Sequence, residues 1–139
     1  MIGKWEWIMK TFDLDKTIEY WVKSSAYDFA TATSLLETKR FPHALFFGHL
    51  AIEKILKALV VRATKEHAPY THSLSLLIKK ANIDTPEYIL DQLAEYTGFN
   101  IEARYPDDKL EFYNKCTEDF TKNKLKEMEE VYKWLTQKF

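Results

Sequence analysis

The chain has 139 residues, enough for one domain with a proper core, and 46% of them are hydrophobic and 29% charged. With only 3 glycines and 4 prolines, the composition favours a few long helices over a sheet of many strands. The net charge of −1 excludes a global basic field, so any binding of nucleic acid needs a local cationic cleft.

The first predicted element is a helix that Asp13 caps and that runs to about Arg40. Residues 1–12 precede it as an N-terminal extension, and the domain core is expected over about residues 14–138. The extension lacks the apolar segment and cleavage site of a signal peptide, which predicts a cytoplasmic protein. Apolar steps of three and four residues predict a buried face made of Ile18, Trp21, Val22, Ala26, Phe29, Ala30, Thr33 and Leu36.

A second helix is predicted from Pro42, which suits a first helical turn, to about Ala63. Glu53 and its neighbouring lysines interrupt the most apolar stretch of the chain, so we expect no membrane span. On a helical wheel the core face of this helix comprises Leu45, Gly48, Ile52, Ile55, Leu56 and Leu59.

A charged stripe lies on the opposite side of the second helix. His49, Glu53 and Lys57 follow one another at four-residue steps, with Lys54 beside them. Large apolar residues border these charges, so the stripe predicts a buried polar network, a partner interface or the wall of a cleft. Glu53 buried without partners would cost several kcal/mol, on the order of 3–5.

The next part of the chain is predicted as short pieces. Thr71 can cap a short helix over residues 73–81. Another begins at Thr85 and Pro86, and Gly98 is expected to end it in a left-handed conformation. Residues 99–108 are predicted to be irregular.

A final helix is predicted to begin between Glu111 and Thr117 and to continue almost to Phe139. The single cysteine, Cys116, excludes an internal disulfide and is expected to be a small buried residue. Together the elements predict an all-α, up-and-down antiparallel bundle in a single domain over residues 1–139. It has four main helices, of which the third is broken into short pieces.

Four features of the sequence carry a resemblance to a known family. They are Trp21 with Ala26, Asp28 and Ala32; Phe46-Phe47 with His49-Leu-Ala-Ile-Glu53-Lys54-Ile-Leu-Lys57-Ala; Thr71-His72-Ser-Leu-Ser-Leu-Leu; and Ala103-Arg104-Tyr105-Pro106-Asp107. With these features, spread over residues 14–135, the chain resembles the HEPN domain family. The resemblance implies a helical bundle that dimerises and leaves a cleft between the protomers. It also implies either a metal-independent endoribonuclease, often a toxin encoded beside a nucleotidyltransferase, or a nucleotide-binding or assembly module.

The ribonuclease members of this family carry an arginine followed four to six residues later by a histidine. The arginine stabilises phosphate charge while the histidine moves a proton. No histidine follows Arg104 in this chain, and the pattern Arg62-Ala-Thr-Lys-Glu-His67 lies too early in the sequence, so we interpret it as chance. The catalytic candidates are therefore Arg104 and a displaced His72.

The leading prediction is a nucleotide- or RNA-binding module paired with a nucleotidyltransferase in a toxin–antitoxin-like system. Lys54, Lys57, His72, Arg104 and Tyr105 are the expected ligand-binding residues, whereas His49, Glu53 and Asp107 are expected in a structural network or interface. That network is predicted to link the second helix to the Arg-Tyr-Pro segment. The alternatives are an endoribonuclease acting through Arg104 and a non-catalytic dimeric scaffold. We expect a homodimer through the second-helix face, and no metal or cofactor.

Overall fold

The computed structural model describes residues 12–139, and this part of the chain is helical without a strand. The predicted all-α bundle is therefore confirmed, while most of the predicted N-terminal extension lies outside the described residues. In chain order the helices are α2 (Leu14–Glu37), α3 (Phe41–Thr64), α4 (Leu74–Lys80), α5 (Glu87–Arg104), α6 (Glu111–Lys115) and α7 (Glu118–Thr136). No helix among them is long and apolar enough to cross a membrane.

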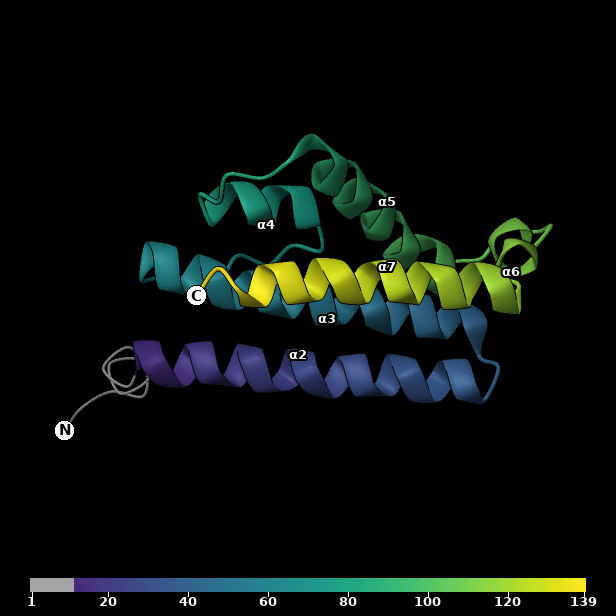
Figure 1. The fold of residues 1–139 in the computed structure, drawn as a ribbon, viewed down its shortest axis with the longest axis horizontal. Helices are drawn as coiled ribbons and strands as arrows, with labels where there is room; N and C mark the ends of the chain where they lie inside the picture. Colours follow the sequence, from purple (N-terminus) through teal and green to yellow (C-terminus); the bar gives the residue numbers. More distant parts are fainter. Residues whose placement is uncertain (1–11) are drawn as a thin grey trace.

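Helix α3 occupies the centre of the bundle. Figure 1 shows α2 on one side of it, α4 and α5 on the other, and α7 running along its length. The predicted core face of α3 is buried, but so is most of the remaining circumference from Ala51 to Val61. The protomer's own helices cover His49, Glu53 and Lys57 of the predicted second face, whereas Phe46, Leu50 and Lys54 are half-buried, so most of this face is not available to a dimer partner.

Gly48 allows α3 and α7 to approach closely. A Cβ atom added at this position would lie 2.8 Å from Met128 Cε and 3.1 Å from Leu125 Cδ2. Both α7 side chains are buried, so neither has free space into which it can withdraw. The absence of a side chain at Gly48 is therefore a packing requirement.

The N-terminal cap of α2 is confirmed, since the Asp13 carboxylate accepts a hydrogen bond from the Lys16 amide at 3.1 Å. The helix ends at Glu37, before the predicted Arg40, because Lys39 adopts a left-handed conformation with φ of 63°. Cys116 is buried as predicted.

The buried face of α2 differs from the predicted one. Of the expected positions, those that are exposed are Ala26, Ala30 and Thr33. The fully buried positions are instead Ser25, Asp28 and Ala32. Asp28 pairs with Lys54 of α3 at 2.7 Å, and the Ser25 hydroxyl lies 2.8 Å from that of Tyr132 on α7. Polar residues can face the core here because each finds a partner there.

Three predicted features between residues 71 and 104 are wrong: the cap of α4, the end of α5, and the irregular conformation of residues 99–104, which are helical. Ser73, rather than Thr71, caps α4 by accepting a hydrogen bond from the Leu76 amide at 3.2 Å. Gly98 does not end a helix, and no glycine in the described part of the chain has a positive φ. Helix α5 continues through Gly98 to Arg104 because the residues beyond it extend the buried face: Phe99, Asn100 and Ala103 join Ile89, Leu93 and Tyr96.

The final helix is divided into α6 and α7. Thr117 caps α7 by accepting a hydrogen bond from the Phe120 amide at 3.2 Å. The predicted boundary between Glu111 and Thr117 therefore contains a short helix, and the long C-terminal helix starts just after it.

Candidate functional site

Glu53 is the centre of a buried polar network. Its Oε1 accepts a hydrogen bond from His72 Nδ1 at 2.8 Å, and its Oε2 lies 3.1 Å from Lys57 Nζ. Glu53 is only 4% exposed, and a carboxylate so deep is costly unless charged or hydrogen-bonded partners surround it. The structure therefore brings the α3 stripe together with the loop that precedes α4.

His49 lies one turn before Glu53 and is fully buried. Its Nε2 donates to the backbone carbonyl of His72 at 3.0 Å and lies 3.9 Å from Glu53 Oε1. Burial is the main cause that lowers the pKa of His49, and it outweighs the opposing effects of the His72 carbonyl and the Glu53 carboxylate. His49 is accordingly neutral near pH 7.

Asn100 on α5 extends the network from His49 to Arg104. Its Nδ2 donates to His49 Nδ1 at 3.4 Å, and its Oδ1 accepts a hydrogen bond from Arg104 Nη2. Arg104 Nε also donates to the Asn100 backbone carbonyl at 3.1 Å. We refer to His49, Glu53, Lys57, His72, Asn100 and Arg104 as the Glu53 network.

Sequence analysis missed Asn100. A signal was present, because Asn100 and Arg104 are four residues apart and would share one face of any helix containing both. The segment was expected to be irregular, so this spacing carried no weight.

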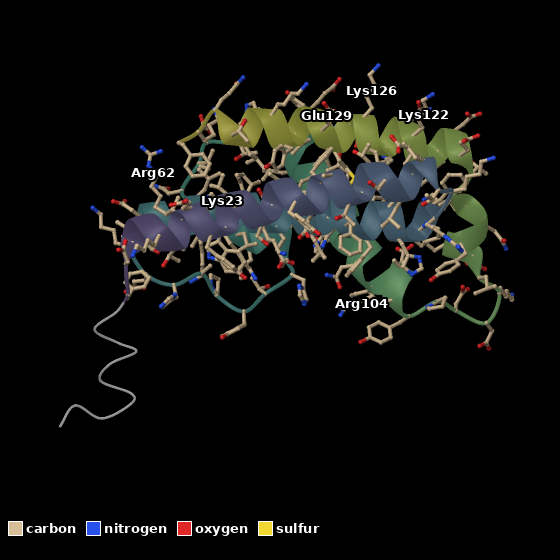
Figure 2. The ribbon with its side chains drawn as sticks, turned by 90° about the horizontal axis from the view of Figure 1, so that it is seen from below. Lys23, Arg62, Arg104, Lys122, Lys126 and Glu129 are labelled. Atoms are coloured by element: carbon tan, nitrogen blue, oxygen red, sulfur yellow. The ribbon has the colours of Figure 1, made fainter. Side chains whose placement is uncertain are left out.

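Arg104 and His72 are the parts of the network that reach solvent. The Arg104 guanidinium lies close to two aromatic rings, 5.8 Å from the centroid of Phe46 and 5.3 Å from that of Tyr105. Figure 2 shows Arg104 at the edge of the molecule opposite Lys122 and Lys126. The His72 side chain is 55% exposed. The network thus ends in two nitrogen-bearing groups that face water.

The two predicted lysines occupy different positions. Lys57 is buried, with its Nζ between Glu53 and the Trp21 ring, whose centroid is 5.2 Å away. Lys54 points toward α2, where it pairs with Asp28 at 2.7 Å and donates to the Ser24 hydroxyl at 2.8 Å. Each ammonium group is therefore engaged with another helix.

The remaining candidates lie outside the network. Asp107 accepts a hydrogen bond from the Glu111 amide at 2.8 Å and so holds the start of α6. Arg62 donates to the Lys138 carbonyl at 3.3 Å, whereas the His67 ring packs against Phe12 at a tilt of 59°, with ring centroids 4.3 Å apart. Among residues 12–139 no cluster of three potential ligands is arranged to hold a metal ion.

Comparison with known proteins agrees with this architecture. The family model for the HEPN domain matches residues 18–138 of the chain. The fold is also similar to the crystal structure of TT1696 from Thermus thermophilus, with a TM-score of 0.74 and 16% sequence identity. That similarity covers 88% of this chain and 98% of the other. No curated protein matches the chain significantly.

The bundle, together with the match over most of its length, defines a HEPN-type helical module. The chain belongs to the HEPN domain family, and in general terms it is a nucleotide- or RNA-related module. The similarity to TT1696 supports the fold alone.

Proposed function

We propose that the chain binds the phosphate groups of a nucleotide or of single-stranded RNA through Arg104 and His72. The observation that carries this proposal is that one buried network, centred on Glu53, orients both exposed groups. A guanidinium forms strong, directional hydrogen bonds with phosphate oxygens, and a fixed guanidinium loses less entropy on binding. Tyr105, which is 68% exposed beside Arg104, offers a face on which a base can stack.

Lys57 and Lys54 contribute less to this proposed site than the sequence pattern suggested. Both ammonium groups already have a carboxylate partner, so their charges are largely compensated. Lys57 supports the site indirectly, because its ammonium group pairs with Glu53 and Glu53 accepts the hydrogen bond from His72. Lys54 belongs to the contact between α2 and α3.

A second candidate function is metal-independent cleavage of RNA, favoured by the orientation of His72. Because the Glu53 carboxylate can only accept, His72 Nδ1 carries the proton of their hydrogen bond when Glu53 is ionised. The neutral ring then presents Nε2 as a proton acceptor, as a general base requires. In this reaction His72 would take the proton of a 2′-hydroxyl while Arg104 stabilises the phosphate.

A pairing with a nucleotidyltransferase in a toxin–antitoxin-like system, and a homodimer, remain part of this proposal. HEPN domains often dimerise. Since most of α3 is covered, the surface available for such contacts includes the outer side of α2, where Tyr20 and Tyr27 are exposed. If neither nucleotide nor RNA binds, the non-catalytic dimeric scaffold is the interpretation that remains.

The experiment compares wild-type protein with Arg104→Ala and with Arg40→Ala, which removes an exposed arginine from the turn before α3. Binding of an end-labelled, mixed-sequence single-stranded RNA is measured by fluorescence anisotropy in excess EDTA. We expect Arg104→Ala to weaken binding by about tenfold or more and Arg40→Ala to leave it nearly unchanged. Equal affinity of all three proteins would contradict the proposed site.

The same reactions, resolved on a denaturing gel, separate binding from cleavage. Cleavage that is lost in Arg104→Ala and in His72→Ala would establish the ribonuclease. Intact RNA with Arg104-dependent binding would leave the binding module as the function.

A further inference from the structure

We infer that Asn100 is a positioning residue that couples the placement of Arg104 to the protonation state of His49. This inference rests on the proposed function, because it concerns the regulation of that same site. It would make the site a proton-sensitive one, in which Arg104 is held for its ligand only while His49 is neutral.

The orientation of the Asn100 amide is fixed from the Arg104 side. A guanidinium has donors and no acceptor, so the amide atom that faces Arg104 Nη2 must be the oxygen. The amide nitrogen then faces His49 at 3.4 Å and donates to it. His49 Nδ1 must therefore be the unprotonated, accepting nitrogen of the ring.

The same tautomer follows independently from the other side of the ring. His49 Nε2 lies 3.0 Å from the His72 carbonyl, which can only accept, so Nε2 carries the proton. Both ends of the chain of hydrogen bonds thus require one neutral tautomer. Donation runs in one direction along it, from Arg104 to Asn100 to His49 to the His72 carbonyl.

Protonation of His49 breaks this order. A proton on Nδ1 would face the Asn100 amide group, which also donates, and the contact would become repulsive. Rotation of the amide by half a turn restores an acceptor toward His49. It also turns the amide nitrogen toward Arg104, which then keeps only the backbone carbonyl of Asn100 as a hydrogen-bond acceptor.

The charged groups around His49 act in opposite directions on its protonation, and burial decides in favour of the neutral ring. Glu53 on the same helix, 3.9 Å away, favours a proton on His49. Arg104 on α5 opposes it, and so does the His72 ring, whose centroid is 6.4 Å away on the loop before α4, whenever that ring carries a charge. Lys57 offsets the Glu53 carboxylate from the other side. Full burial of His49 then decides the balance.

The first arm of the test is a nuclear magnetic resonance titration of the ligand-free wild-type protein. We expect the ring nitrogens of His49 to show a protonated Nε2 and an unprotonated Nδ1 at about pH 8. The side-chain NH signals of Arg104 should shift at the pH at which His49 titrates, and in Asn100→Leu they should not follow it. A protonated Nδ1 at about pH 8, or Arg104 signals that do not shift at the pH at which His49 titrates, would overturn the inference.

The second arm measures RNA affinity between about pH 8 and about pH 5.5. The variants are His49→Gln, which keeps a donor and an acceptor but does not titrate; Asn100→Leu; and the exposed control Asn123→Leu. Relative to His49→Gln, wild type should lose at least about threefold more affinity on acidification. Asn100→Leu should bind about three- to tenfold more weakly at about pH 8, whereas Asn123→Leu should behave as wild type.

The two arms separate this inference from the proposed function. RNA binding whose pH profile is the same in wild type and His49→Gln would reject the coupling and leave the binding function standing. Absence of RNA binding at every pH would reject the function, while the titration of the free protein still decides the coupling.

Discussion

Glu53 is the residue on which the buried charges of α3 depend. It is the counter-ion of Lys57 and the hydrogen-bond acceptor of His72, and its side chain is only 5% exposed. Removal of one member of a buried pair leaves the other as an uncompensated charge, which costs far more than an exposed pair contributes. Stability is therefore more sensitive to this carboxylate than to any surface ion pair.

We predict that Glu53→Ala lowers the free energy of unfolding by about 3–5 kcal/mol in urea denaturation. The matched control is Glu129→Ala, which removes an exposed i,i+4 pair with Lys133 and should cost less than about 1 kcal/mol. Glu53→Leu combined with Lys57→Met should recover part of the loss, since no charge is then stranded. Equal effects of the first two substitutions would refute the burial argument.

His49 gives the protein a pH-dependent stability. Since burial lowers its pKa below the ordinary 6.5, the unfolded chain binds more protons than the folded protein as the pH falls below that value. The contribution is fully present above about pH 6.5 and is lost toward the folded-state pKa, with a slope of up to about 1.4 kcal/mol per pH unit. We predict that urea denaturation of wild type shows this acid-side loss and that His49→Gln loses less stability over the same range.

At the scale of single residues, the sequence predicted the α3 stripe but not the complete site. Four-residue spacing was enough to place His49, Glu53 and Lys57 together, because they belong to one continuous helix. The partner of Lys54 was not predictable, since Asp28 lies on a helix whose rotation about its axis is set by packing. Asn100 was missed for a different reason: its helix was predicted to end at Gly98, two residues too early to include it.

Among the helices, α5 shows how tertiary packing outweighs a local stop signal. A glycine within a helix costs up to about 1 kcal/mol relative to alanine, whereas burial of one large apolar side chain stabilises by about 1.5–3 kcal/mol. Phe99 and Ala103 add enough buried surface to carry the helix past Gly98. The side-chain cap at Asp13 was predictable because it acts locally, whereas the cap that Thr117 forms for α7 was not predicted.

Replacement of the two helical glycines by alanine should change the stability of the protein in opposite directions. At Gly98 an added Cβ meets only the flexible carboxylate of Glu102 at 3.3 Å, so Gly98→Ala should stabilise the protein by about 0.5–1 kcal/mol. At Gly48 the new atom collides with Met128, so Gly48→Ala should destabilise it by about 1–3 kcal/mol. Thermal denaturation of the two variants beside wild type measures both signs, and a stabilised Gly48→Ala would contradict the close packing of α3 and α7.

At the scale of the whole molecule, the cations of the described residues do not all gather on the side of Arg104. The net charge is −1, and Lys122 and Lys126 lie on the edge of the molecule away from Arg104 (Figure 2). Any affinity for a polyanion should therefore come from few contacts, with a correspondingly weak dependence on salt.

We predict that the slope of log K against log salt concentration for single-stranded RNA is shallow, on the order of −1 to −2. Arg104→Ala should reduce its magnitude by about one phosphate contact, whereas Arg40→Ala should not change it. Anisotropy titrations at several salt concentrations provide the slopes. A steep slope that Arg104→Ala leaves intact would place the RNA on another surface.

The central position of α3 has a consequence for how uniquely the chain folds. Shifting this helix by one residue would rotate its side chains by about 100°. Glu53 would then lose His72, and Lys54 would lose Asp28. An entirely apolar α3 would incur no such penalty and could settle in several nearly isoenergetic arrangements. The ionic groups of α3 therefore raise the free energy of the competing folds, and this widens the gap that separates them from the native one.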